Sequence, residues 1–159
     1  MWEINLYKGH PYGKCRYYKA NGTLNREVNY DFVLTYGVFV PDGFLKVNYK
    51  TETPESNVSG SFSMPVVKTT GDKILSYLYG IISFPEFAVE NGISGIVYAQ
   101  LTVDKNGKVG NVSIVRGVHE SLDWEVCRII SELPELTPAK LNDQNTDVHM
   151  ILPVKFILQ

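Results

Sequence analysis

The stretch GIVYAQLTVDKNGKVGNVSIVR, Gly95–Arg116, decides the fold class of this chain. Apolar and polar residues alternate on both sides of DKNG, Asp104–Gly107, and this period of two predicts strands with one apolar face. A short Asp/Asn/Gly sequence between two such runs is typical of a tight hairpin turn. We therefore predict an antiparallel hairpin, with strands over residues 95–104 and 108–116, whose apolar face is covered by other elements.

The hairpin is followed by SLDWEVCRIISEL, Ser121–Leu133, which has a helical period. Its apolar residues form one continuous stripe: Leu122, Val126, Ile129, Ile130 and Leu133. This pattern predicts an amphipathic helix. We expect Ser121 to be its N-cap, Asp123 to lie in its first turn and Pro134 to end it. A last strand is predicted over Asp147–Leu158.

The residues before the hairpin predict two further helices. In GDKILSYLYGII, Gly71–Ile82, apolar residues recur at helical spacing, with Asp72 as the expected N-cap. In SFPEFAVENG, Ser83–Gly92, Pro85 suits a first helical turn and Gly92 suits a left-handed C-terminal cap. The order from Gly71 onward is thus helix, short helix, hairpin, helix and strand.

The first third of the chain predicts antiparallel β-structure, because Tyr, Val and Phe alternate with turn signals such as Asn21–Gly22 and Pro41–Gly43. TETPESNVSGSF, residues 51–62, is polar and rich in turn-forming residues, as expected for a connection. We therefore predict two domains. Residues 1–60 would form a small antiparallel β module, and residues 61–159 would form an α+β domain.

Composition limits the classes of function. Hydrophobic residues make up 44% of the 159 residues and the net charge is -2, so a globular core is expected and a general attraction to nucleic acid is not. Cys15 and Cys127 have no metal-ligand spacing, and they are either a disulfide or two unpaired thiols. The start of the sequence lacks the pattern of a signal peptide, and its longest apolar stretch is too short to span a bilayer.

His119, Ser121, Asp123 and Cys127 are the residue types of nucleophilic catalysis, but their spacing does not favour it. On a helix that starts near Ser121, the side chains of Ser121 and Asp123 do not face each other, and a capped helix explains both. Neither a calcium loop nor a phosphate-binding glycine loop is present. His149 lies in an alternating strand and is expected at the surface. We predict no enzyme activity, no cofactor and no metal site.

Residues 71–159 are similar to the C-terminal domain of TonB, the periplasmic energy transducer of double-membraned bacteria. The matching features occur in order: Phe84-Pro85 with Ala88, Gly95, Asp104 and Gly107, the strand with Val109, Val112, Ile114 and Val115, Leu122-Asp123, Pro138 and Lys140, and a terminal V-x-x-x-L-P-V-x-F-like strand. Residues 7–50 resemble MORN-like repeats more loosely, through Gly9, Gly13, Tyr17, Tyr18, Asn21, Gly22, Leu24, Glu27 and Tyr30.

The TonB resemblance implies a two-layer α+β fold with helices packed on one face of a small antiparallel sheet. It also implies a non-enzymatic, periplasmic role in TonB-dependent transport, in which the domain binds the TonB box of an outer-membrane receptor as an added strand. The implied edge is the last strand. Pro153 lacks an N–H and so suits an edge, and we predict that contacts concentrate at the following residues: Asp147, Val148, His149, Met150, Ile151 and Leu152.

The sequence leaves two alternatives open for this edge. The edge could be covered by the N-terminal module or pair with itself in a homodimer, and the protein could then be a periplasmic interaction or scaffold protein whose MORN-like module carries the specificity. The sequence also lacks the membrane anchor and Pro-rich linker of a full transducer. Inner-membrane motor proteins are therefore expected as partners only if a longer gene product carries an anchor; otherwise the chain is a soluble TonB-like adaptor.

Overall fold

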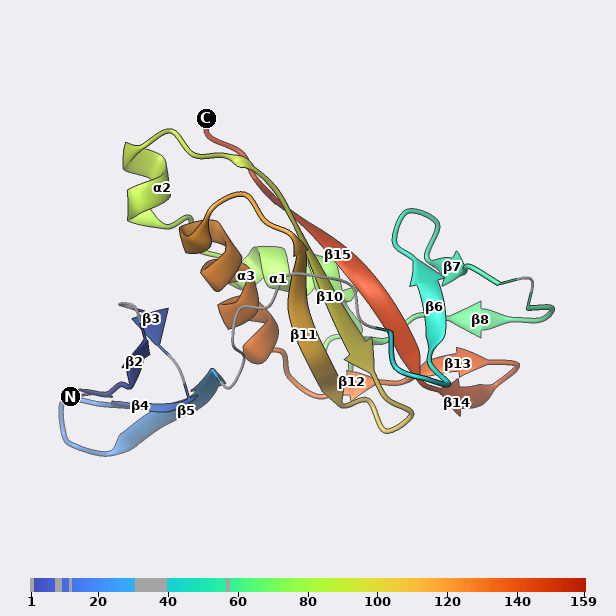
Figure 1. Cartoon of the computed structure of the whole chain (residues 1–159). Helices are drawn as coiled ribbons and strands as arrows, with labels where there is room; N and C mark the ends of the chain where they lie inside the picture. Colours follow the sequence, from blue (N-terminus) through green and yellow to red (C-terminus); the bar gives the residue numbers. More distant parts are fainter. Residues whose placement is uncertain (1, 8–9, 12, 31–39, 57) are drawn as a thin grey trace.

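The structure is a computed structural model that describes residues 2–7, 10–11, 13–30, 40–56 and 58–159 (Figure 1). Gly9 of the MORN-like pattern lies outside these residues. The helices are α1 (Ile74–Ile81), α2 (Glu86–Glu90) and α3 (Glu120–Ser131). The longer strands are β4 (Gly13–Tyr18), β5 (Leu24–Tyr30), β6 (Leu45–Asn48), β10 (Gly95–Val103), β11 (Val109–Arg116) and β15 (Val148–Phe156).

Short strands complete the element order. They are β1 (Trp2–Glu3), β2 (Leu6–Tyr7), β3 (His10–Pro11), β7 (Thr53–Pro54), β8 (Phe62–Ser63), β9 (Val66–Val67), β12 (Leu136–Thr137), β13 (Ala139–Leu141) and β14 (Gln144–Thr146). Within the described part of the chain, no helix combines the length and the apolar character needed to cross a membrane.

The predicted hairpin is the centre of the fold. Strands β10 and β11 pair antiparallel, and their turn is closed by Asp104, whose carboxylate accepts hydrogen bonds from the backbone N–H groups of Asn106 and Lys108. Gly107 adopts a φ of 81°, and a Cβ there would lie 2.0 Å from the carbonyl oxygen of Leu136. The turn therefore requires glycine for its backbone conformation and for its close contact with the segment after α3.

The main sheet has the strand order β11-β10-β15-β6-β7. β15 is antiparallel to β10 along its whole length, from Val148 opposite Val103 to Phe156 opposite Gly95. β6 runs parallel to β15. The α+β class and the antiparallel core are as predicted, whereas the parallel strand β6 makes the sheet mixed.

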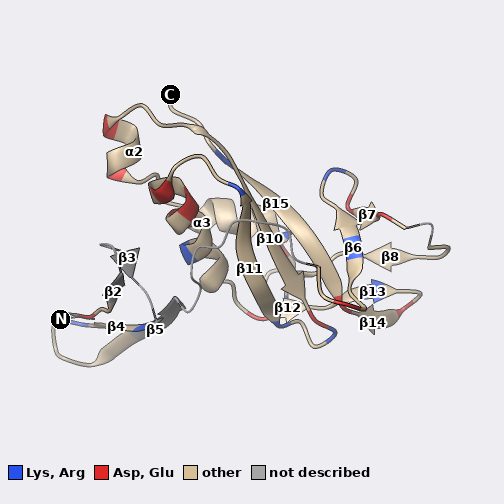
Figure 2. Ribbon diagram, viewed as in Figure 1, with Lys and Arg blue, Asp and Glu red and all other residues tan. Residues whose placement is uncertain are grey.

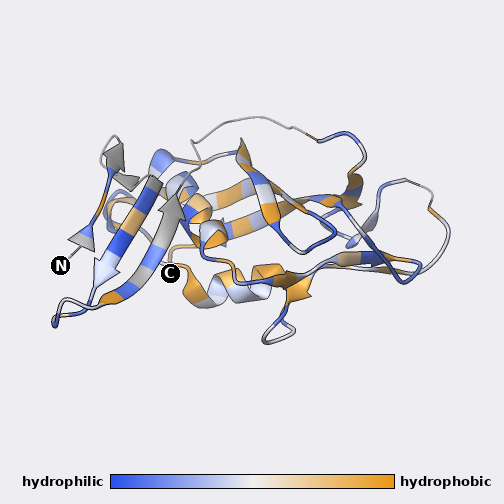
Figure 3. Ribbon diagram, turned by 90° about the horizontal axis from the view of Figure 1, so that it is seen from below, coloured by the Kyte–Doolittle hydropathy of each residue, from blue (hydrophilic) through white to orange (hydrophobic). Residues whose placement is uncertain are grey.

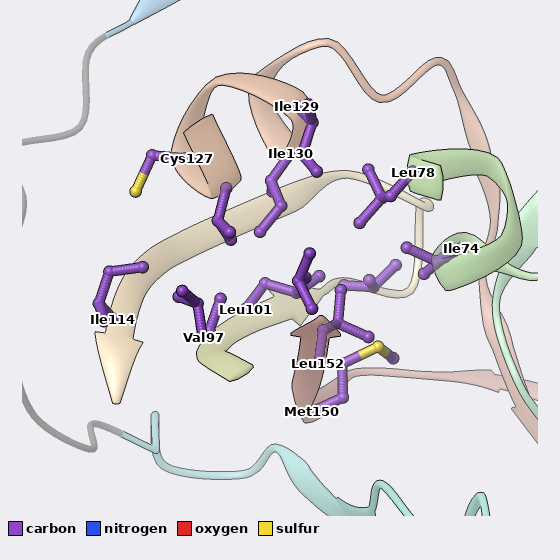
Figure 4. Close-up of a cluster of buried hydrophobic side chains, with 14 of the residues drawn as sticks. Ile74, Leu78, Val97, Leu101, Ile114, Cys127, Ile129, Ile130, Met150 and Leu152 are labelled. Atoms are coloured by element: carbon purple, nitrogen blue, oxygen red, sulfur yellow. The ribbon is translucent and has the colours of Figure 1, made fainter. Parts of the chain in front are cut away.

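Helices α1 and α3 cover one face of this sheet (Figure 4). The core combines the predicted stripe of α3 with alternate residues of the strands and two residues of α1; Figure 4 labels Ile74, Leu78, Val97, Leu101, Ile114, Cys127, Ile129, Ile130, Met150 and Leu152. Because each strand contributes every second residue to this layer, the alternation in the sequence corresponds to the buried face.

The N-cap of helix α3 lies two residues earlier than predicted. Its N-cap is His119 and not Ser121: His119 is extended, and its Nδ1 accepts a hydrogen bond from the Ser121 backbone N–H at 3.1 Å. The carboxylate of Asp123 accepts from the Val118 backbone N–H at 3.1 Å. The imidazole of His119 and the carboxylate of Asp123 thus accept hydrogen bonds from backbone N–H groups near the start of the helix. The sequence predicted the hydroxyl of Ser121 as the capping group instead.

The two earlier helices lie where the sequence placed them. The N-cap position of α1 is Lys73, not Asp72, and its side chain makes no capping hydrogen bond. Helix α2 follows Pro85 directly, and Gly92 beyond its C-terminus has a φ of 64°, the left-handed conformation that was predicted.

The N-terminal residues form the predicted hairpin. β4 and β5 pair antiparallel across the Asn21–Gly22 turn, and β1 extends them to a three-stranded sheet. In Figure 3 the central strands carry much of the hydrophobic colour. Strands β6 and β7 also precede residue 60, but they belong to the main sheet.

Candidate partner-binding edge

Strand β15 has two edges, and only one of them is bound by β10. Main-chain groups of successive residues in a strand point to opposite edges. The carbonyl oxygen of Asp147 accepts from Leu45 of β6, and the carbonyl oxygen of Pro153 accepts from Tyr79 of α1. The odd-numbered residues of β15 therefore face away from β10, and we call this side the outer edge of β15.

The start of the outer edge is covered by β6. Val148 pairs with Leu45 and His149 pairs with Lys46, and the Leu45 N–H lies 2.9 Å from the Asp147 carbonyl oxygen. The ladder between the two strands ends there. β6 follows β15 in the strand order of the main sheet, and β7 pairs with its far side.

Five of the six residues of the predicted binding segment lie on β15, Asp147 directly precedes it, and their neighbours differ. Val148 and His149 pair with β6, while the side chains of Met150 and Leu152 are buried in the core. Ile151 is half-buried. The carboxylate of Asp147 accepts a hydrogen bond from the Lys105 backbone N–H at 2.7 Å.

The far end of the outer edge is covered by one side chain. The hydroxyl of Tyr79 donates a hydrogen bond to the Pro153 carbonyl oxygen at 3.3 Å and accepts one from the Lys155 backbone N–H at 3.0 Å. Pro153 has no N–H, and its position among the outward-facing residues means that the missing donor removes no bond to β10. The sequence did not indicate this role of Tyr79.

Helix α1 positions Tyr79 at the outer edge. Ile74 and Leu78 are buried in the core and fix the helix against the sheet. Tyr79 follows Leu78 and lies on the helix surface with 41% of its area exposed. Neighbouring residues on a helix point about a quarter turn apart, so the burial of Leu78 leaves Tyr79 beside the strand rather than beneath it.

Tyr79 divides a groove that follows the outer edge of β15. One recess, toward β6, is lined by Tyr49, Met64, Leu75, Tyr79, Met150, Ile151 and Pro153, among others. The other recess, toward the C-terminus, is lined by Leu75, Tyr79, Ile82, Phe84, Pro153, Lys155, Phe156 and Ile157. We call the two recesses together the edge groove. Its walls are mainly apolar, and Ile157 at its end is 71% exposed.

Charged residues also line this groove, Glu52 and Lys73 in the recess toward β6 and Lys155 in the other recess. Lys73 pairs with Glu52 of the β6–β7 connection at 3.0 Å, which links this connection to the start of α1. Figure 2 shows that acidic residues gather instead on α2 and at the first turn of α3, where Glu86, Glu90 and Glu120 lie. The edge groove is thus a mainly apolar surface bordered by hydrogen-bonding main chain, which is suited to an extended peptide.

His149 is buried rather than exposed as predicted. Its side chain has 1% of its area accessible, and its Nε2 lies 3.1 Å from Oε1 of Gln100, whose amide nitrogen in turn bonds to Ser113. Burial, and then the positive charge of Lys46, lower the pKa of His149, while Glu55 opposes them. This imidazole is held neutral on the sheet face opposite α1 and α3.

The residues that resembled a catalytic cluster form a helix cap and part of a core. His119 Nδ1 and Ser121 Oγ lie 2.9 Å apart, and the carboxylate of Asp123 accepts a hydrogen bond from the Val118 backbone N–H. Burial, with a smaller contribution from Asp123, raises the pKa of Cys127 to about 12. Cys127 is therefore a protonated core thiol, which is a poor nucleophile. The part of the chain that the structure describes holds no group of three residues that could bind a metal ion.

The second half of the chain is similar to known proteins. Residues 82–158 match the family described as Gram-negative bacterial TonB protein C-terminal. Two solution structures of the Helicobacter pylori TonB C-terminal domain are similar to this chain. The first is 22% identical, with a TM-score of 0.45, over 55% of this chain and 78% of the other. The second is 21% identical, with a TM-score of 0.44, over 53% and 88%.

A search of curated proteins gave no match. The family match spans α2, the hairpin of β10 and β11, helix α3 and strand β15. It therefore contains the whole outer edge of β15. Residues 82–158 of this chain belong to the TonB C-terminal family.

Proposed function

We propose that the protein is a periplasmic TonB-like protein that binds short segments of outer-membrane receptors during TonB-dependent transport. The segment binds as an extended strand along the outer edge of β15. The partner is a TonB box or a segment of similar chemistry. Coupling to inner-membrane motor proteins belongs to the proposal only for a longer form of the protein that carries an anchor.

The observation that supports this proposal most strongly is the state of the outer edge beyond His149. Among the residues that the structure describes, the outward main chain of β15 there is bonded to the hydroxyl of one half-exposed tyrosine and not to a neighbouring strand. A strand edge that lacks a strand partner is a template for the addition of a peptide. The edge groove beside it offers apolar walls for alternate side chains of the peptide.

The position of β6 modifies the predicted contact segment. Asp147, Val148 and His149 already meet β6, so a partner that leaves β6 in place has access to Met150, Ile151 and Leu152 and then to the edge through Lys155. Binding along Asp147–His149 requires β6 to leave. We therefore propose that the partner strand continues the sheet from the end of β6 toward the C-terminus.

The experiment that tests strand addition uses backbone N-methylation of the peptide. A synthetic peptide that carries a TonB box is compared with two variants, one N-methylated at every second residue and the other at the alternate residues. Both variants keep all side chains. In a strand, only one of the two sets of N–H groups faces β15, so we expect one variant to lose binding and the other to bind as the parent peptide does.

The two N-methylated peptides are matched controls for each other in size and solubility. Equal affinity of both variants, when the parent peptide binds, would contradict strand addition. Failure of every peptide to bind, together with dimerisation of the protein in sedimentation, would instead support the alternative in which this edge pairs with a second copy.

A further inference from the structure

The Tyr79 hydroxyl makes the same pair of bonds to β15 that one residue of a neighbouring parallel strand would make. In a parallel pair, a residue donates its N–H to one carbonyl and accepts from the N–H two residues further along the opposite strand. Tyr79 donates to Pro153 and accepts from Lys155, the residue two positions on. One phenol oxygen therefore satisfies both groups that flank Val154.

The direction of the added strand follows from β6. Leu45 of β6 donates its N–H to Asp147 in the same sense, opposite Val148, and β6 is parallel to β15. β6 and Tyr79 thus bind the two ends of the same outer edge, with Ile151 between them. The two recesses share Leu75, Tyr79 and Pro153 in their linings, so Tyr79 lies where they meet.

We propose that Tyr79 is a displaceable substitute for the partner strand, and that a binding segment must rotate it away to reach Pro153 and Lys155. This inference rests on the proposed function, since it specifies how the same edge is kept satisfied before binding and which peptide fits it. Rotation about the side-chain torsions of an exposed residue needs no movement of α1, which Leu78 and Ile74 hold in the core.

The surface that opens when the Tyr79 side chain rotates away determines which peptide side chains fit beside β15. Once Tyr79 leaves, the two recesses become one mainly apolar channel whose lining includes Met64, Leu75, Ile82, Phe84 and Ile157. A segment with apolar residues at alternate positions fits this channel, because one set of side chains points into it while the main chain pairs with β15. A segment with charged residues beside the apolar walls would lose hydration, and Lys73 and Glu52 in the recess toward β6 already pair with each other.

The experiment measures binding of a synthetic TonB-box peptide to the wild-type protein, to Tyr79→Phe and to Tyr77→Phe. Tyr79→Phe keeps the ring but frees the edge, so the peptide no longer competes with the hydroxyl. We expect its affinity to rise about fivefold, the factor that corresponds to roughly 1 kcal/mol for one net hydrogen bond. Tyr77→Phe is the matched control on the same helix, where we expect wild-type affinity.

Amide hydrogen exchange of Lys155 provides a second readout that needs no peptide. The Lys155 N–H bonds to the Tyr79 hydroxyl, so Tyr79→Phe should accelerate its exchange in the free protein, and peptide binding should slow it again in both proteins. A charged residue placed at the groove-facing positions of the peptide should weaken binding to both.

The outcomes separate this inference from the function on which it rests. If the peptide binds wild type and Tyr79→Phe equally, or binds Tyr79→Phe more weakly, Tyr79 is not a substitute strand, although strand addition stands. If neither protein binds any TonB-box peptide, strand addition fails and the role of Tyr79 in binding fails with it. Unchanged exchange of Lys155 in Tyr79→Phe would refute the edge bond itself.

Discussion

Replacement of Arg128 by methionine tests how α1 is held in place beside the outer edge. The Arg128 guanidinium bonds to both carboxylate oxygens of Glu125, at 2.7 and 2.6 Å, to Glu132 at 3.0 Å and to the carbonyl oxygen of Ile81 at the end of α1. Glu125 also accepts from the Ser83 backbone N–H at 2.6 Å. This cluster therefore joins α3 to the end of α1.

The expected loss of stability follows from the burial of these groups. The side chain of Arg128 is 24% exposed and that of Glu125 is 10% exposed, so the pair lies between the surface and the core. Removal of one partner from a fully buried pair costs about 3–5 kcal/mol, whereas a surface pair contributes about 0–1 kcal/mol. For this partly buried cluster we expect Arg128→Met to lower the free energy of unfolding by roughly 2–3 kcal/mol.

Urea unfolding followed by circular dichroism measures this change through the shift of the midpoint at constant slope. A control variant, Arg128→Met with Glu125→Gln, removes the stranded carboxylate charge and should recover part of the loss, because an unpaired buried charge costs more than an unpaired amide. A loss below about 0.5 kcal/mol in the single variant would refute the reasoning that this cluster fastens α1 to α3.

Further predictions concern the turn, the buried histidine and the core thiol. Gly107→Ala should lower the free energy of unfolding by roughly 2 kcal/mol or more, because it combines a positive φ with a Cβ that meets the Leu136 carbonyl oxygen; thermal unfolding measures it. Burial lowers the pKa of His149 in the folded state, so the unfolded chain takes up the proton first and stability should fall as pH drops from about 6.5 toward the folded pKa. Urea midpoints from pH 7.5 to 4.5 should show this fall in the wild type and a weaker one in His149→Gln. Cys127 should resist iodoacetamide at pH 8 in the native protein and react in urea, because burial raises its pKa to about 12; mass spectrometry measures both, and rapid native alkylation would show that the thiol is accessible.

The elements that the sequence predicted well are those whose signals are local. The hairpin and α3 were placed within one or two residues, since alternation along β10 and β11 and the stripe from Leu122 to Ile130 report directly on burial. The identity of the α3 cap was wrong because His119 and Ser121 can both supply the capping atom, and only the backbone conformation distinguishes them.

The outer edge of β15 could be predicted only in part. The sequence predicted a strand at the C-terminus and explained Pro153, but it did not indicate the partners on the outer side; binding at this strand stays a prediction. Pairing of Leu45 with Val148 joins segments about a hundred positions apart, and no local pattern specifies such a contact. The bond from Tyr79 depends on how α1 docks, and the burial of His149 depends on the second face of the sheet. The division of the chain at residue 60 stays a prediction.

The most direct test of the central claim compares two neighbouring amides of β15 during a peptide titration followed by NMR. The Lys155 N–H faces the outer edge and the Val154 N–H faces β10. If a TonB-box peptide adds as a strand, the Lys155 amide should change its chemical shift strongly and become protected from exchange, while that of Val154 should change little. Saturable binding that leaves Lys155 unchanged and shifts residues of β4, β5 or α2 instead would contradict the account.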